Sequence, residues 1–212
     1  MPNRPIFNMM EVVVSTRNKN KFKEIGLILK DAKIKAVSLD GFSSIPEVKE
    51  DSKTFADNAA KKALTIARIT KQLTVADDSG LEVPALGGAP GVYSARFSGK
   101  AATYDSNNEK LLRMLNGVAM KKRRARFVCC VAIADAHGIV DIVEADYCGY
   151  IARERKGKNG FGYDPVFFCP RLQKTFAQLT PAMKNKLSHR ARAFLKAKKS
   201  ILKYIRSKRG CP

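Results

Sequence analysis

Residues 126–147 decide the fold of this chain. They read RFVCCVAIA (126–134), DAHG (135–138) and IVDIVEADY (139–147). Two apolar, partly β-branched runs flank four residues that favour a tight turn, so the stretch predicts an antiparallel hairpin. Any sheet that contains this pair includes at least one antiparallel neighbour, which excludes a purely parallel sheet.

Helical and strand patterns alternate on both sides of the hairpin. A strand is expected at 11–16, and an amphipathic helix follows the polar turn at 17–20. Thr54, with Asp57 three residues later, predicts the start of a helix that ends near Lys71. Before the hairpin, the remaining expectations are a strand and loop in 34–48, a short strand at 73–76 that stops at Asp77, a loop at 83–102 and a helix at 105–115. After the hairpin, we expect a glycine-rich segment at 157–162 and one long helix from 180 to about 205. This alternation predicts an α/β fold with a mixed sheet.

The length and composition predict one folded unit. The chain has 212 residues, of which 45% are hydrophobic, and no linker divides it. We expect an N-terminal extension at 1–10, a single domain at 11–206 and a basic tail at 207–212. The longest apolar stretch, 127–134, is shorter than the roughly 20 residues of a membrane helix, and residues 1–10 lack the apolar segment of a signal peptide. A cytoplasmic protein without a membrane partner is therefore predicted.

Five cysteines support a reducing compartment. Their number is odd, no Cys-x-x-Cys pair is present, and only two histidines accompany them. We interpret them as small hydrophobic residues or free thiols and not as zinc ligands. They are Cys129, Cys130, Cys148, Cys169 and Cys211.

The formal net charge of +21 would attract polyanions. The positive charge is concentrated at 121–126 and at 196–209. These clusters have two interpretations, a nucleic-acid-binding patch and a solvated lysine-rich surface. No aromatic residues interrupt the first cluster to provide stacking faces for bases, so we favour the solvated surface and expect no nucleic-acid partner.

Two polar segments follow predicted strands. The first, Thr16–Lys21, lies between a strand end and a helix N-terminus, where free N–H groups suit phosphate, although an exposed basic turn is the alternative. The second, Asp77-Asp78-Ser79-Gly80, offers carboxylate ligands for Mg²⁺, although an ordinary turn would also use these residues. Further acids that could complete a metal site are Glu47, Glu50 and Asp51. Spacing alone does not choose among them.

Two later segments could bind a nucleobase. Gly160–Pro165 combines glycines, which allow close approach, with aromatic faces and the acceptor Asp164; the alternative is a glycine loop with core aromatics. Lys184 and Ser188 are four residues apart and would share a helix face, with His189 and Arg190 following them. An arginine fork supplies the donors that a keto-purine needs, although a His–Arg pair on a helix is usually at the surface.

In this order and at about these separations, the segments resemble the inosine triphosphate pyrophosphatase family, also described as dITP/XTP pyrophosphatases or noncanonical purine NTP pyrophosphatases. The resemblance runs from about residue 11 to about residue 205. It rests on residues 15–24, 50–59, 76–83, 86–96, 160–167 and 184–191. Some positions depart from the family pattern without removing a proposed catalytic group. They are Arg17, Ser52, Asp57, Gln178 and Met183.

The resemblance implies a two-lobed α/β structure with a long central mixed sheet, flanking helices, a deep cleft between the lobes, and a homodimer. It also implies a Mg²⁺-dependent enzyme that hydrolyses ITP, dITP and XTP to the nucleoside monophosphate and pyrophosphate, cleansing the nucleotide pool. Glu50 and Asp78 would bind Mg²⁺, and Asp78 would accept a proton from the attacking water. Ser79 would contact the substrate.

The remaining implied site residues bind the two ends of the substrate. The triphosphate would be held by Thr16, Arg17, Asn18, Lys19, Asn20 and Lys21. The base would be held by Phe161, Gly162, Tyr163 and Asp164, with Phe161 as the stacking face. The pocket would be completed by Lys184, His189 and Arg190. The alternatives are a nucleotide pyrophosphatase of different base preference, and a basic nucleic-acid-binding protein, which would leave Asp77-Asp78 unexplained.

Overall fold

The structure, a computed structural model, describes residues 10–30, 33–208 and 210. The predicted N-terminal extension, apart from Met10, and Cys211 lie outside these residues. Within them, no helix is sufficiently long and apolar to cross a membrane.

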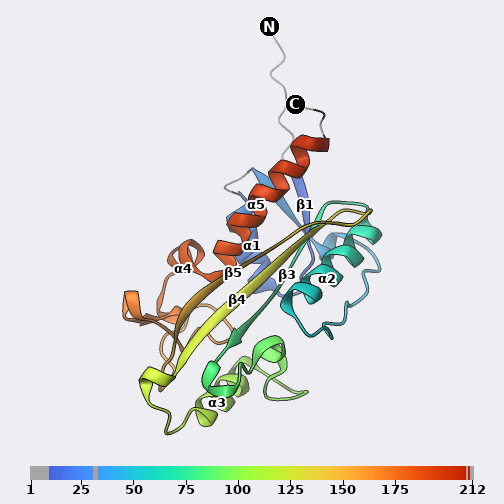
Figure 1. Cartoon of the computed structure of the whole chain (residues 1–212). Coiled ribbons are helices and arrows are strands. Elements are labelled where there is room, and N and C mark those ends of the chain that lie inside the picture. Colours follow the sequence, from blue (N-terminus) through green and yellow to red (C-terminus); the bar gives the residue numbers. More distant parts are fainter. Residues whose placement is uncertain (1–9, 31–32, 209, 211–212) are drawn as a thin grey trace.

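A seven-stranded sheet with the order β2-β1-β3-β4-β5-β6-β7 forms the centre of the molecule (Figure 1). β1 pairs in parallel with β2 and β3, whereas the pairs from β3 through β7 are antiparallel. The strands are β1 (Met10–Val14), β2 (Ile34–Ser38), β3 (Thr74–Glu82), β4 (Arg124–Ala134), β5 (Ile139–Ile151), β6 (Phe167–Cys169) and β7 (Lys174–Thr175). The predicted mixed sheet and the hairpin, formed by β4 and β5, are confirmed.

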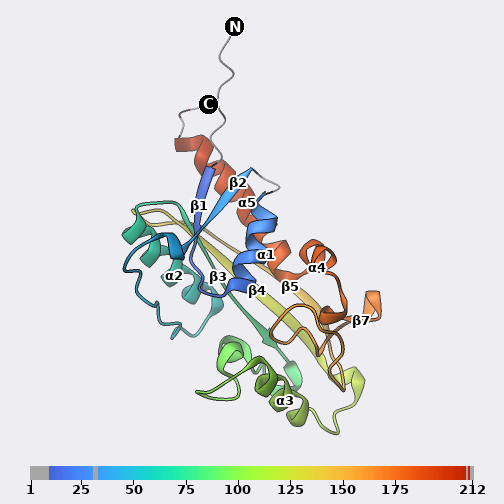
Figure 2. The same ribbon diagram turned by 180° about the vertical axis from the view of Figure 1, so that it is seen from behind.

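Helices cover both faces of the sheet. They are α1 (Lys19–Lys30), α2 (Phe55–Thr70), α3 (Tyr104–Met114), α4 (Pro181–Leu187) and α5 (His189–Lys208), and short 3₁₀ turns include Pro84–Leu86, Gly91–Arg96, Met120–Lys122 and Phe176–Gln178. α1 and α5 pack on one face and α2 on the other, while α3 lies at the far end of β3 (Figures 1 and 2). Alternate residues of β4 therefore enter two cores: Cys129 and Val131 pack under α1 and α5, and Val128 and Cys130 pack under α2.

A third core forms the end of the molecule near α3. Phe127, Tyr147, Phe167 and Phe176 form a cluster of aromatic rings there, with Phe127 and Phe167 at a centroid distance of 4.5 Å. Leu111 of α3 completes this core. The sheet thus joins two packed ends, one under α1, α2 and α5 and one beside α3.

The prediction that the strand stops at Asp77 is wrong. β3 continues to Glu82, because β4 pairs with it along its whole length, with Asp77 opposite Val131 and Asp78 opposite Cys130. The local sequence resembles a turn, but the long-range pairing with the hairpin satisfies the backbone groups of these residues. Successive side chains of a strand point to opposite faces, so Asp77 faces α1 and α5, and Asp78 faces α2.

The predicted single helix from 180 to 205 is also wrong, because it is divided at Ser188. This residue adopts an extended conformation (φ −64°, ψ 161°), and its hydroxyl accepts a hydrogen bond from the N–H of Ala191. Ser188 therefore caps the N-terminus of α5. Lys184 and Ser188 consequently do not share one continuous helix face, and His189 and Arg190 occupy the first turn of α5.

The basic cluster at 121–126 is only partly a solvated surface. Lys121, Lys122 and Arg124 are exposed, but Arg123 is buried. Its guanidinium donates to the carbonyl oxygens of Leu115, Ile151 and Ala152, each at 2.7 Å. Arg123 therefore ties the loop after α3 to the end of β5, a structural role that neither interpretation of the cluster included.

We expect Arg123→Ala to reduce the free energy of unfolding by about 2 kcal/mol, because three carbonyl groups lose a charged donor. Lys122→Ala, which removes an exposed neighbour, should change it by less than about 0.5 kcal/mol. Urea denaturation of both variants measures the difference. Equal stability of the two variants would contradict the structural role.

Candidate active site

The turn between β1 and α1 is built around Asn18. Its side-chain oxygen accepts hydrogen bonds from the N–H groups of Asn20 (3.0 Å) and Lys21 (3.1 Å), and its own N–H donates to the hydroxyl of Thr16 (3.2 Å). Asn18 is thus the N-cap of α1. The positive end of the helix dipole and the Lys21 ammonium are placed at the same point, which suits an anion.

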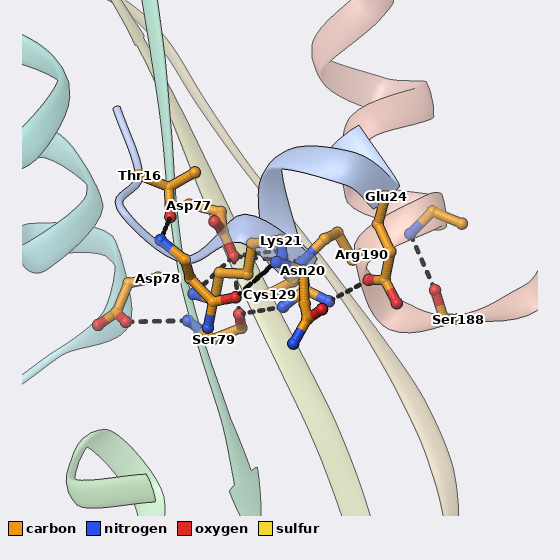
Figure 3. A network of polar contacts seen from close by, with 12 residues as sticks. Thr16, Asn20, Lys21, Glu24, Asp77, Asp78, Ser79, Cys129, Ser188 and Arg190 are labelled. Atoms are coloured by element: carbon orange, nitrogen blue, oxygen red, sulfur yellow. Dashed lines mark hydrogen bonds and ion pairs between the residues drawn. The ribbon is translucent and has the colours of Figure 1, made fainter. Parts of the chain in front are cut away.

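Asp77 is the shared ion-pair partner of two cationic side chains on the face of the sheet that α1 and α5 cover (Figure 3). One of its carboxylate oxygens lies 3.0 Å from the Lys21 ammonium and 3.4 Å from Nε of Arg190, and it accepts a hydrogen bond from the Ser79 hydroxyl (2.8 Å). Burial alone would raise the pKa of Asp77, but the charges of Lys21 and Arg190 outweigh it and hold this pKa well below its usual range. Asp77 is therefore a permanent anion that positions two cations.

The ion pairs continue from Arg190 as a chain of alternating charge. Arg190 donates to Glu24 (2.7 Å), Glu24 pairs with Lys184 (2.9 Å), and Lys184 pairs with Asp164 (2.5 Å). All four side chains are mostly buried. This series of ion pairs, from Lys21 to Asp164, therefore connects the turn after β1 to the loop at 160–165 through side chains of α1, α4 and α5.

Asp78 faces the opposite side, where α2 supplies its neighbours. One carboxylate oxygen accepts from the amide of Asn58 (3.0 Å), and the other lies 3.9 Å from the Lys62 ammonium. The same ammonium lies 2.5 Å from a carboxylate oxygen of Glu50 and 2.6 Å from the carbonyl oxygen of Asp77. Burial raises the pKa of Asp78 by more than Lys62 and Lys21 lower it. A positive charge thus lies between the carboxylates of Glu50 and Asp78.

The loop at 160–165 presents an aromatic ring beside two cations. Asp164 holds the loop by accepting from the N–H of Phe161 (2.8 Å), while the Lys184 ammonium lies 4.6 Å and the Arg190 guanidinium 5.4 Å from the centre of the Phe161 ring. Tyr163 is buried, and its hydroxyl donates to the carbonyl oxygen of Ser94 (2.9 Å). Of the two aromatic residues, Phe161 is the one beside the cations, and Tyr163 anchors the loop.

His189 is a neutral imidazole under this loop. Its ring stacks on Phe127 at a centroid distance of 4.5 Å and an angle of 12°. Burial, together with the charges of Arg190 and Lys184, lowers the pKa of His189 well below its usual value. Its Nδ1 is buried and finds no hydrogen-bond partner among the residues that the structure describes. An unpaired buried polar atom of this kind is uncommon in a folded protein.

These side chains line two adjoining cavities. The first is lined by both the aromatic loop and the Asp78 carboxylate. Of the predicted site residues, it is lined by Asn18, Lys21, Glu50, Asp78, Ser79, Phe161, Gly162, Tyr163, Asp164, Lys184, His189 and Arg190. The second cavity is lined by Thr16 and Arg17 and shares Asn18, Lys21 and Glu50 with the first. Lys19 and Asn20 are exposed and line neither cavity.

Several residues of the site were not predicted from the sequence. Glu24 stood inside a motif without a role, and Asp77 was expected only as a carboxylate that could bind Mg²⁺ together with Asp78. Their burial beside cations is visible only after the chain folds. Asn58 and Lys62 are four residues apart and therefore lie on the same face of α2. This spacing does not indicate a functional site by itself, because residues that pack into the core have the same spacing. Tyr104 also lines the first cavity, and nothing in the sequence connects it to Phe161.

The carboxylate pair of Glu50 and Asp78 is a candidate for metal binding. Among the described residues, no group of three or more His, Cys, Asp or Glu side chains could hold a metal ion. Glu50 and Asp78 nevertheless supply carboxylate oxygens on both sides of a positive charge. This set fits Mg²⁺, which usually takes one or two protein carboxylates and completes its shell with water and phosphate.

The sequence and the fold both match known proteins. The model of the Ham1 family matches residues 12–200. Proteins named dITP/XTP pyrophosphatase are similar to this chain: that of Desulforamulus reducens is 50% identical, covering 89% of this chain and 94% of the relative, and that of Geobacillus kaustophilus is 46% identical, covering 89% and 92%. A HAM1 protein structure from Coxiella burnetii has a TM-score of 0.83 at 38% identity, covering 92% of this chain and 100% of that one.

A second solved structure, the Ham1 protein of Staphylococcus aureus, has a TM-score of 0.80 at 35% identity and covers 92% of this chain and 99% of that one. Family model, relatives and structures thus agree over nearly the whole chain, including every segment that lines the two cavities. This protein belongs to the Ham1 family.

Proposed function

We propose that this protein hydrolyses noncanonical purine nucleoside triphosphates, dITP, XTP and ITP, to the nucleoside monophosphate and pyrophosphate. One observation carries the proposal: a single cavity joins an aromatic base-sized surface at Phe161, the cationic turn at Asn18 and Lys21, and the carboxylates of Glu50 and Asp78. The relatives named dITP/XTP pyrophosphatase support the same activity. Removal of such nucleotides would cleanse the nucleotide pool.

The turn at Thr16–Lys21 would bind the triphosphate. The positive end of the α1 dipole, at Asn18, and the ammonium of Lys21 would attract this anion. The adjoining second cavity continues past Arg17 and Arg96, so a chain of phosphates can extend into it. Lys19 would contribute only to the field at the cavity mouth.

Glu50 and Asp78 would hold Mg²⁺, which when bound neutralises phosphate charge and favours attack on the phosphoanhydride. Asp78 would orient the attacking water and accept its proton. Ser79, bonded to Asp77 and Arg190, would contact the substrate from the other side of the strand.

The base would lie on Phe161, with the donors of Lys184, His189 and Arg190 at its edge. A donor directed at O6 accepts a 6-keto purine, whereas the N6 amino group of adenine would face it donor to donor. Leaving buried polar groups unpaired is what makes such rejection strong. Asp164 would act by holding Lys184 and the Phe161 N–H in place.

We also propose that residues 11–206 act as one domain in the cytoplasm and that the protein is a homodimer, as the resemblance to the family implies. A nucleic-acid-binding role has no comparable support, because the relatives reported above are named dITP/XTP pyrophosphatase. A pyrophosphatase of different base preference is the alternative that the experiment below addresses.

The test is product identification. Purified protein with Mg²⁺ should convert dITP and XTP to the monophosphate and pyrophosphate, and should act far more slowly on dATP. Ion-exchange chromatography separates the monophosphate from the diphosphate, and a pyrophosphate-specific assay identifies the second product. Release of orthophosphate would contradict the pyrophosphatase assignment, and equal rates on dATP would contradict the base preference.

A further inference from the structure

Tyr104 is a half-exposed aromatic residue with a fixed position at the cavity. It is the first residue of α3, whose start is capped by Thr103 and Ser106 in a reciprocal arrangement. The carbonyl oxygen of Tyr104 accepts from the amide of Asn108 (2.7 Å), which also donates to the carbonyl oxygen of Gly162 (2.8 Å). The first turn of α3 is therefore bound directly to the loop that carries Phe161.

The side chain of Tyr104 spans the two ends of the cavity. Its ring lies 6.0 Å from the Phe161 ring, at an angle of 41°, and its hydroxyl oxygen accepts a hydrogen bond from the Asn18 amide (3.1 Å). Phe161 belongs to the base end and Asn18 to the phosphate end. In a nucleotide, the group between the base and the phosphates is the sugar.

The remaining hydrogen-bonding capacity of Tyr104 points to the same group. Its oxygen accepts from Asn18, so its O–H proton remains to be donated, and no acceptor for it is found in the part of the chain that the structure describes. A sugar hydroxyl can accept it, and the apolar edge of a pentose can pack on the ring. An exposed fraction of 44% for so large an apolar side chain beside a cavity also favours a ligand as its cover.

We propose that Tyr104 contacts the sugar of the bound nucleotide, with its ring against the pentose and its hydroxyl donating to a sugar hydroxyl. The proposal rests on the proposed function, since it takes the base to lie at Phe161 and the phosphates at Asn18. Tyr104 would stabilise the bound substrate and the transition state by the same amount, because it is uncharged and takes no part in the proton transfer assigned to Asp78. Its loss should therefore raise KM and leave kcat nearly unchanged.

The first experiment compares Tyr104→Ala with Met114→Ala, a residue at the other end of the same helix with the same exposed fraction of 44%. Tyr104→Ala should raise KM for ITP roughly tenfold, change kcat by less than about twofold, and leave the ratio of kcat/KM for ITP and ATP unchanged. Calorimetric titration with IMP should show a similar loss of affinity. Met114→Ala should match the wild type in all of these.

The second experiment uses Tyr104→Phe, which keeps the ring and removes the hydroxyl, both as a donor to the sugar and as the acceptor for the Asn18 amide. Its KM for ITP should be about two- to tenfold above that of the wild type, the scale of one neutral hydrogen bond. With 2′,3′-dideoxy-ITP, which lacks both sugar hydroxyls, the ratio of the KM of the variant to that of the wild type should be smaller than with ITP, and the remainder is the effect of the lost hydrogen bond with Asn18. The same comparison with dITP shows whether the 2′ or the 3′ hydroxyl is the acceptor.

The results separate the inference from the proposed function. Failure of the wild type to bind IMP or to cleave ITP would remove both. An active wild type with an unchanged KM in Tyr104→Ala would overturn the contact with Tyr104 alone. A Tyr104→Phe defect that is as large with the dideoxy nucleotide as with ITP would show that the hydroxyl does not bind the sugar, and so would also overturn it.

Discussion

Asp78→Asn is expected to lower kcat for dITP by at least about 10²-fold at saturating Mg²⁺, the usual scale for a general base. The asparagine keeps the size of the side chain but cannot accept a proton. Its oxygen can still accept the hydrogen bond that Asn58 donates to Asp78 in the wild type. The Lys62 ammonium keeps its closer partners, Glu50 and the Asp77 carbonyl oxygen. The fold should therefore survive the substitution, and the loss should be catalytic.

The measurement is steady-state kcat, accompanied by thermal unfolding to verify the fold. Asp51→Asn is a matched control: Asp51 lies beside Glu50, is exposed, and pairs with Lys61 outside the cavity. It should retain nearly full turnover. A turnover of Asp78→Asn close to that of the wild type would show that Asp78 is not the base.

Arg190→Ala is expected to compress the preference for ITP over ATP in kcat/KM by about 10- to 150-fold, the equivalent of one charge-assisted hydrogen bond of about 1.5–3 kcal/mol. An arginine has five N–H groups, and Arg190 uses three of them on Asp77, Glu24 and Ser79. Two remain for the 6-keto oxygen, a bond that ATP never gains. Activation by Mg²⁺ should be unaffected, because Arg190 faces away from Asp78.

Because Arg190 is buried between two carboxylates, its removal also affects stability. Asp77 keeps Lys21 and Glu24 keeps Lys184, so the variant should fold with a lower melting temperature. Arg190→Lys retains the charge but not the fork, and should lose base preference with less destabilisation. Arg192→Ala, on the exposed side of the same helix, is the control. An equal decrease for ITP and ATP in Arg190→Ala would mean that Arg190 binds phosphate instead of the base.

The parts of the fold that the sequence predicts are those with local signals. The hairpin of β4 and β5, the strand and helix around Asn18, and the N-cap at Thr54 each follow from residues close together in the chain, and all are confirmed. The errors arise where distant contacts override local preference. The turn-like residues Asp77–Gly80 are extended because β4 pairs with them, and the helical pattern after Pro181 is interrupted because the Ser188 side chain caps α5.

The same distinction applies to the cavity residues. Motifs such as Asp77-Asp78-Ser79-Gly80 indicate chemistry through residue type, and resemblance to a family supplies their roles. Arg123 was wrongly grouped with surface lysines, because its three carbonyl partners come from two distant segments, Leu115 after α3 and the neighbours Ile151 and Ala152 at the end of β5. Tyr104 is 57 positions before Phe161 by their sequence numbers, and only the packing of α3 beside the loop brings the two rings together.

The extension of β3 through Asp77 and Asp78 has a consequence for how the protein folds. The two aspartates point to opposite faces of the sheet, so a shift of one residue in the pairing of β3 with β4 would exchange these faces. Asp77 would then face α2, and Asp78 would face Lys21 and Arg190. Such a mispaired molecule could bury much of its apolar surface and yet have no catalytic base in place. Recovery of dITP hydrolysis after refolding would therefore measure the fraction of molecules with the correct strand register. Circular dichroism would count compact molecules with the wrong register as native.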